Sequence, residues 1–142
     1  MRRLVIIALR LALAAIFAFA AYSKLRHPWV VFAMSVDSYQ VLPEWAVLAV
    51  ARALPWAELI LAVLLAIGVW LRYTSLAAAA VLGLFFIMML IAYGRGLAID
   101  CGCFGFGEQL SARTLVRDGL LLATAFTLAF LAARPHRQSA AR

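Results

Sequence analysis

Two cysteines stand one residue apart in the glycine-rich stretch IDCGCFGFG, which spans residues 99–107 and holds both cysteines of the chain. A disulfide between Cys101 and Cys103 would close a very small loop and gain only about 1.6 kcal/mol of chain entropy, roughly half the value for fifteen residues. Strained disulfides are oxidising and labile, which suits thiol–disulfide exchange. Gly102 favours this role because glycine freely adopts the backbone angles that closely spaced sulfurs need. The pattern predicts a redox pair.

Two other interpretations of the cysteines stay open. Soft thiolates are good ligands for Cu(I), and the thioethers of Met88 and Met89 precede the loop within reach of it. Buried cysteines also serve as small hydrophobic packing residues. A packing cysteine needs no glycine-rich loop, so redox exchange is the leading interpretation.

The neighbouring charges act on the thiols in opposite directions. Asp100 opposes formation of a thiolate, whereas Arg95 and the N-terminus of the following helix favour it. Cys103 is nearer to that helix and is therefore predicted to be the attacking thiolate. Phe104 completes the loop motif and is counted with Arg95 and Asp100 as a supporting residue.

The composition places this loop in a membrane protein. The chain of 142 residues is 68% hydrophobic and 13% charged, whereas soluble domains are about 45–50% apolar. A membrane-spanning helix needs about 20 apolar residues. The predicted fold is an all-α bundle of four transmembrane helices around Leu4–Tyr22, Pro55–Leu71, Leu76–Tyr93 and Leu115–Ala132. An MRR start followed by an apolar run resembles a secretory signal, but Arg10 interrupts that run, so the first helix is expected to stay uncleaved.

The connections between these helices have their own signals. Prolines 28, 43 and 55 divide residues 28–54 into two pieces too short to span, which predicts short interfacial helices that cap one mouth of the bundle. Pro55 suits the first turn of the second long helix. A tight turn is expected around Arg72–Thr74, and Ser111 is a plausible N-cap. Residues 1–134 are expected to form one domain and residues 135–142 a disordered basic tail. Head-group depth is expected for the aromatic residues of the cap region and its boundary, Trp29, Tyr39, Trp45 and Trp56.

The net charge of +7 does not indicate nucleic-acid binding, because the basic residues lie at helix ends rather than in one stripe. With both termini cytoplasmic, six basic residues lie on each side of the membrane. The inner six lie in short segments free of acidic residues, where the positive-inside bias is most reliable. Both termini are therefore predicted in the cytoplasm of a bacterial inner membrane. The cysteines would then lie outside, where disulfides persist.

Glu58 is the acidic residue that stands out in the second predicted span. Acids within membrane segments are functional hypotheses by default. The structural alternative is an ion pair with Lys24 at the end of the first helix, which would tie two helices together beside the thiols. Lys24 and Glu58 are predicted to shape the charge of the pocket.

Three segments together resemble a known family: AYSKLRHPWVVFAMSVDSYQVLP, ALPWAELILAVLL and RGLAIDCGCFGFG. In this order and spacing they are similar to the methylamine utilisation protein MauE family, a branch of the DoxX-like four-helix membrane proteins. The resemblance covers nearly the whole chain. It implies a role in maturation of a periplasmic, disulfide-rich protein such as the methylamine dehydrogenase β subunit, with the thioredoxin-like protein MauD as partner.

The resemblance leaves the electron acceptor and the mechanism open. By functional analogy, the chain looks like the quinone-coupled oxidases DsbB and vitamin K epoxide reductase, so a quinone is one possible acceptor. Those proteins relay electrons through a second cysteine pair, which this chain lacks. A different class of function is a non-catalytic assembly factor that binds its client through the apolar cap.

Overall fold

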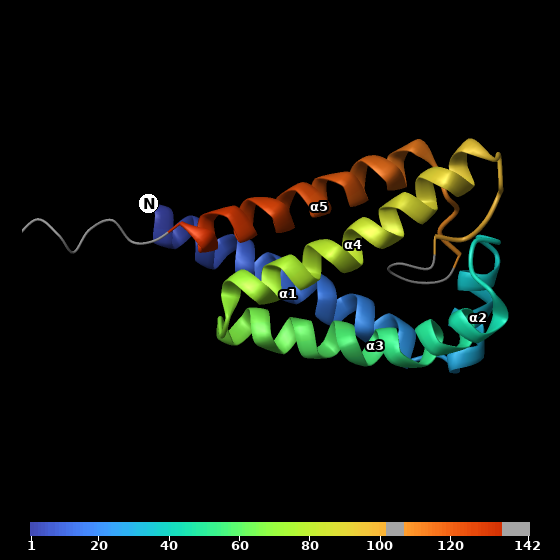
Figure 1. Cartoon of the computed structure of the whole chain (residues 1–142), viewed down its shortest axis with the longest axis horizontal. Coiled ribbons are helices and arrows are strands. Elements are labelled where there is room, and N and C mark those ends of the chain that lie inside the picture. The colour runs from blue at the N-terminus through green and yellow to red at the C-terminus, as the bar shows by residue number, and fades with distance from the viewer. Residues whose placement is uncertain (102–106, 135–142) are drawn as a thin grey trace, which may run out of the picture.

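The computed structural model describes residues 1–101 and 107–134, and within these it contains five α-helices (Figure 1). Four of the described helices are long and apolar enough to cross a membrane, and the short α2 joins the first two of them. The prediction of an all-α, multi-pass membrane bundle is confirmed. The bounds are α1 Arg2–Leu25, α2 Trp29–Asp37, α3 Glu44–Ile67, α4 Leu71–Gly94 and α5 Ala112–Ala133.

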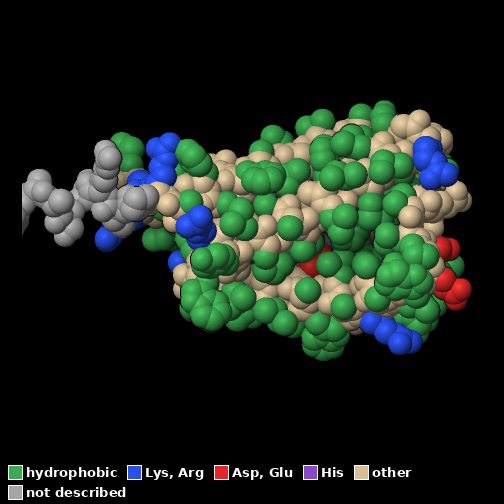
Figure 2. Space-filling view, viewed as in Figure 1, with side chains coloured by type: hydrophobic (Ala, Val, Ile, Leu, Met, Phe, Trp, Pro, Cys, Tyr) green, Lys and Arg blue, Asp and Glu red, His purple; other side chains and the backbone are tan. Residues whose placement is uncertain are grey.

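The long helices form two pairs, α1 with α3 and α4 with α5, which lie side by side along the long axis of the molecule (Figure 1). Leu13, Phe17, Leu65 and Leu128 fill the core between the pairs. Large apolar side chains also cover the outer faces of the long helices (Figure 2). Apolar residues on all sides of a helix are typical of a membrane span, in which the outer face meets lipid.

The two ends of the bundle carry different groups. At one end the Arg2 guanidinium donates hydrogen bonds to the backbone oxygens of Leu131 (2.7 Å) and Arg134 (2.9 Å), so the start of α1 lies against the end of α5. The opposite end carries α2, the end of α4 and the start of α5 (Figure 1). Cys101 packs there against Met89 and Ala92 of α4 and lies beside Asp118 of α5. The cysteine therefore lies at the end of the bundle remote from the N-terminus.

The prediction of a short interfacial helix is wrong for the second of the two segments between the prolines. Residues 44–54 are the first half of α3, and Pro55 is buried inside this helix rather than in its first turn. Pro55 removes one backbone hydrogen bond, but membrane helices tolerate proline where neighbouring groups compensate. Val47 and Ala51 pack on Phe32 and Val36 of α2. This packing explains why the helix continues across a residue that usually ends one.

The predicted turn at Arg72–Thr74 is also displaced, because the chain reverses direction earlier, at residues 68–70. Gly68 ends α3 in the left-handed conformation, with φ +84°. Glycine is the usual residue at such a helix end, since it carries no Cβ penalty there. Thr74 instead lies inside α4, where its hydroxyl donates to the backbone oxygen of Trp70 at 3.0 Å.

Alanine at Gly68 is expected to destabilise the bundle by about 1–2 kcal/mol, the cost of a left-handed residue with a Cβ. A Cβ at this position would also meet the guanidinium of Arg10 from α1. The measurement is the midpoint of unfolding in a detergent titration. Gly94→Ala is the matched control, because a Cβ at Gly94 meets open space. Equal midpoints for the two variants would contradict the expectation.

The start of α5 agrees with its predicted cap. The Ser111 hydroxyl accepts a hydrogen bond from the Thr114 backbone, and the Thr114 hydroxyl accepts one from the Ser111 backbone at 2.9 Å. This reciprocal pair satisfies two backbone donors at the helix start. α5 ends at Ala133, before Pro135 as expected. Residues 135–142 lie outside the described residues, and the predicted disorder and domain boundary stay predictions.

Candidate functional site

The backbone of Cys101 is fixed on both sides. Its N–H donates to the Glu108 backbone oxygen at 2.8 Å, and its own carbonyl oxygen accepts a hydrogen bond from the Tyr39 hydroxyl at 2.6 Å. The Leu110 N–H donates to the Ile99 carbonyl oxygen at 2.8 Å, so the two arms of the loop pair with each other. Cys101 is only 1% exposed. The fold thus holds this cysteine in a defined, buried position beside Tyr39 and the end of α4.

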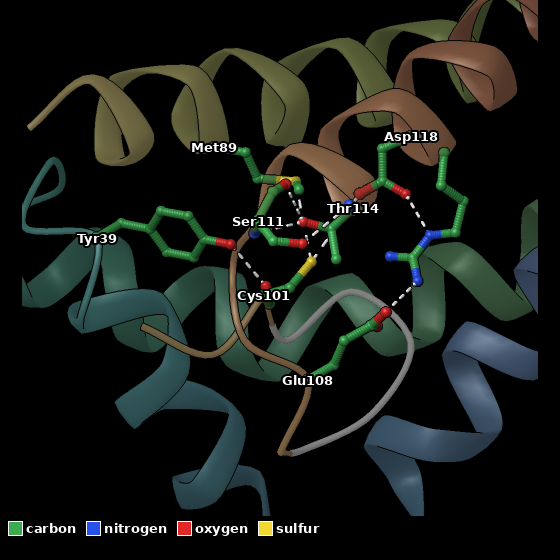
Figure 3. A network of polar contacts seen from close by, with 8 residues as sticks. Tyr39, Met89, Cys101, Glu108, Ser111, Thr114 and Asp118 are labelled. Atoms are coloured by element: carbon green, nitrogen blue, oxygen red, sulfur yellow. Dashed lines mark hydrogen bonds and ion pairs between the residues drawn. The ribbon is translucent and has the colours of Figure 1, made fainter. Parts of the chain in front are cut away.

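The sulfur of Cys101 lies between a thioether from one helix and a carboxylate from another. It is 3.9 Å from the Sδ of Met89 on α4 and 3.9 Å from Oδ2 of Asp118 on α5 (Figure 3). Met89 is fully buried and Asp118 is 5% exposed. A soft sulfur on one side keeps the Cu(I) interpretation open. A carboxylate on the other side is able to exchange a proton with a thiol.

Asp118 belongs to a short chain of charges. Its Oδ1 accepts a hydrogen bond from Nε of Arg117 at 3.1 Å, and Nη1 of Arg117 donates to Oε1 of Glu108 at 2.6 Å (Figure 3). Glu108 is on the same loop arm whose backbone binds Cys101. Charge-assisted hydrogen bonds of this kind are short and directional. Arg117 therefore orients Asp118 and ties the loop to α5.

Glu58 forms the ion pair with Lys24 that the sequence predicts as its structural alternative. Nζ of Lys24 lies 3.0 Å from Oε1 of Glu58, and the two side chains are 1% and 6% exposed. The ammonium also lies 5.2 Å from the centre of the Phe32 ring, within cation–π range. This buried ion pair joins α1 to α3 and places α2 over it.

A small cavity connects this ion pair with Asp118. Lys24, Glu58 and Asp118 all line it, and its walls are apolar, with Phe17, Phe85 and Phe86 among them. Figure 2 shows an acidic patch at the bottom of a hollow between α3 and α4, away from the charged ends. The volume of the cavity is about 30 Å³, which is room for about two water molecules. Charged groups from three helices thus line one small, largely apolar cavity.

The other predicted site residues are less closely associated with the sulfur. Arg95 is exposed at the end of α4, where it donates to Oε1 of Gln40 at 3.4 Å. Asp100 is half-buried and forms an antiparallel backbone bridge with Gln109. Three predicted residues lie outside the described residues, and their roles stay predictions: Gly102, Cys103 and Phe104.

Four residues of the site are absent from the sequence prediction: Tyr39, Glu108, Arg117 and Asp118. Tyr39 is expected at head-group depth, but it is 1% exposed and binds the Cys101 carbonyl. Asp118 has a signal in the sequence, because it is an acidic residue inside the last apolar segment, and such residues are functional candidates by default. Its position beside Cys101 depends on the pairing of α4 with α5 and is visible only in the fold.

Comparison with known proteins gives consistent matches along the chain. The family model described as "Methylamine utilisation protein MauE" matches residues 2–131. A protein named methylamine utilization protein MauE from Paracoccus denitrificans is 38% identical over 129 residues, which are 89% of this chain and 69% of the relative. The protein of that name from Paracoccus versutus is 42% identical over 133 residues, 90% of this chain and 71% of the relative.

A third relative with this name, from Methylorubrum extorquens, is 38% identical over 115 residues, 79% of this chain and 61% of the relative. The matched part therefore spans about 61–71% of the length of these relatives. No solved structure gives a significant match. The family match extends from the first turn of α1 to the last turn of α5 and includes every charged group of the site. The chain belongs to the methylamine utilisation protein MauE family.

Proposed function

We propose that this chain is a membrane thiol–disulfide exchange protein that works through the Cys101-Gly102-Cys103 pair. The observation that carries the proposal is the environment of Cys101, whose sulfur is held beside a buried carboxylate. A structural cysteine needs neither a charged neighbour nor a fixed loop, whereas exchange requires a thiolate to form and to be protonated again. Arg117, Lys24 and Glu58 surround the same region and set its charge.

The partner in this proposal is a thioredoxin-like protein, and the client is an exported, disulfide-rich protein. The names of the relatives refer to methylamine utilization, which makes the methylamine dehydrogenase β subunit the first client to test. The partner's dithiol supplies two electrons that reduce the Cys101–Cys103 disulfide. A hydrophobic acceptor such as a quinone then takes these two electrons and two protons, and the disulfide forms again.

The orientation in the proposal puts both termini in the cytoplasm of the inner membrane and the cysteine loop outside. Arg2, Arg3, Arg72 and Arg134 lie at the terminal end of the bundle without an acidic residue in the same segments. Short segments rich in arginine favour the cytoplasmic side. The cysteine pair then lies in the compartment where disulfides persist.

Thiol trapping in intact cells tests both the orientation and the redox state. A membrane-impermeant maleimide is added with and without prior reduction, and the labelling is read as a mass shift. We expect labelling only after reduction, because in this proposal the two cysteines form a disulfide on the outer side of the membrane, which the reagent reaches. A cysteine introduced into the C-terminal tail is the matched control, and it should label only after the cells are opened.

The other outcomes favour different functions. Labelling without a reductant would indicate thiols outside the cytoplasm and would favour Cu(I) binding, for which Met89 provides a soft neighbour. Labelling of the tail but not of the loop would reverse the orientation and remove the oxidase mechanism. A non-catalytic assembly factor predicts that serine at both cysteines leaves maturation of the client unchanged, whereas changes at Trp29 or Trp45 abolish it.

A further inference from the structure

The two oxygens of the Asp118 carboxylate have different partners. Oδ1 accepts the hydrogen bond from Arg117, whereas Oδ2 is directed to the sulfur of Cys101 at 3.9 Å (Figure 3). Arg117 is fixed in turn by Glu108 at 2.6 Å. Asp118 is buried, with only 5% of its surface exposed. One oxygen is thus held for orientation, and the other is available to the reacting sulfur.

The inner side of Asp118 opens into the cavity that it shares with Lys24 and Glu58. Oε1 of Glu58 binds Lys24, but its Oε2 is buried and has no hydrogen-bond partner among the described residues. A buried polar atom without a partner is rare and calls for an explanation such as a bound water or a catalytic role. The cavity has room for about two water molecules, which would supply the missing hydrogen bonds and link the two carboxylates.

Thiol–disulfide exchange at Cys101 requires a source of protons for a buried sulfur. When the disulfide breaks, the electron pair stays on one sulfur, and a thiolate buried in apolar surroundings is costly unless it is paired or protonated. Cys101 is 1% exposed, so water from outside does not reach its sulfur in this state. A group that is able to carry an exchangeable proton, the carboxyl of Asp118, lies 3.9 Å from this sulfur.

We propose that Asp118 is a catalytic residue that gives a proton to the sulfur of Cys101 on reduction and takes it back on oxidation. The Lys24 ammonium lines the same cavity, so the carboxylate that remains while the pair is reduced has a buried cation beside that space. The inference rests on the proposed exchange function and adds to it the group that handles protons. Arg117 is a positioning residue, because it acts by holding Asp118.

A partner thiolate attacks the sulfur of Cys103, the Cys101–Cys103 bond breaks, and the electron pair leaves on the sulfur of Cys101. The acid form of Asp118 donates its proton to that sulfur. The partner's second thiolate attacks its own mixed disulfide and releases Cys103, which takes a proton from water. Two electrons have passed from the partner's dithiol to the pair, and the two protons that the dithiol lost are matched by two bound to the cysteines.

The charged groups that face Asp118 come from several elements. Arg117 lies on the same helix, Glu108 on the loop, Lys24 on α1 and Glu58 on α3. The wall contributed by α4 is apolar at the cavity, where Val81, Leu82, Phe85 and Phe86 line it. A spectroscopic readout of the carboxyl itself is therefore sharper than a pH profile, because it reports on carboxyl groups alone.

The experiment uses the full chain in lipid nanodiscs, with dithiothreitol as the reductant and a small aromatic disulfide as the oxidant. The infrared spectrum of the reduced protein minus that of the oxidised protein reports changes in carboxyl protonation, and transfer to heavy water shifts such bands. We expect a carboxyl band in the wild type that is lost in Asp118→Asn. We also expect Asp118→Asn to slow reduction by about 100-fold, the lower range for removal of a general acid. Asp37→Asn is the matched control, since Asp37 is an exposed acid at the same end of the bundle.

The wild-type spectrum tests the inference even if Asp118→Asn does not fold, because absence of a carboxyl band from the wild type overturns it. An unchanged or faster reduction rate in a folded Asp118→Asn variant overturns it as well. If the wild type cycles between disulfide and dithiol while the variant keeps both rate and band, only this inference fails. If the wild-type cysteines do not cycle at all, the proposed exchange function fails, and the role of Asp118 fails with it.

Discussion

Replacing Lys24 with methionine is expected to destabilise the bundle by about 3–5 kcal/mol, the usual cost of breaking a buried ion pair from one side. The ammonium lies 3.0 Å from Oε1 of Glu58, and both side chains are almost fully buried. Its removal leaves a carboxylate in an apolar interior and also removes the contact with the Phe32 ring. Because the pair joins α1 to α3, the loss should appear as an earlier transition when the protein is unfolded by a denaturing detergent.

The double variant Lys24→Met, Glu58→Met separates the ion pair from simple packing. Replacement of both partners by apolar residues of similar size is often neutral or stabilising, so the double variant should recover most of the loss. Arg72→Met is the control, because Arg72 is an exposed basic residue at the far end of the bundle. A single variant as stable as the wild type, or a double variant less stable than the single one, would contradict a structural role for the pair.

Serine at Cys101 is expected to lower the rate of exchange by more than about a thousandfold, a loss typical of removing a reacting nucleophile. The two cysteines should nevertheless differ in what they trap. Cys101 is 1% exposed, so a partner's sulfur is expected to attack Cys103. With a thioredoxin-like partner whose own resolving cysteine is replaced by serine, and a small aromatic disulfide as the oxidant, Cys101→Ser should form a mixed disulfide through Cys103 that no second thiol resolves. It should accumulate as a covalent complex on a non-reducing gel.

Cys103→Ser provides the matched comparison for this experiment. The remaining Cys101 is buried between Met89 and Asp118, so this variant should form no covalent complex although its exchange rate falls equally. Equal trapping by both variants would show that the partner reaches Cys101 directly. Client maturation at the wild-type rate in both variants would remove the exchange function and favour the assembly-factor interpretation.

Local signals in the sequence were sufficient to predict the membrane spans and the start of the last helix. Four long apolar segments predict four spans, because each backbone polar group in a bilayer must be satisfied within its own helix. Ser111 predicts the start of α5, since its hydroxyl satisfies a backbone donor at that point. The same reasoning failed at Pro55. A proline that usually begins or ends a helix lies inside α3, where packing on α2 outweighs one lost hydrogen bond.

Composition, apolar length and motif spacing are properties of the chain, so the membrane bundle, the family and the cysteine motif were predictable from the sequence alone. It also named Lys24 and Glu58 as partners across 34 positions, and the structure places them 3.0 Å apart. That Tyr39 and Asp118 belong to the site is visible only in the folded protein. Their contacts with Cys101 span 62 and 17 positions in the sequence. Such contacts arise when the connection between α2 and α3 and the start of α5 come together at the Cys101 loop, and packing of this kind leaves no local pattern in either segment.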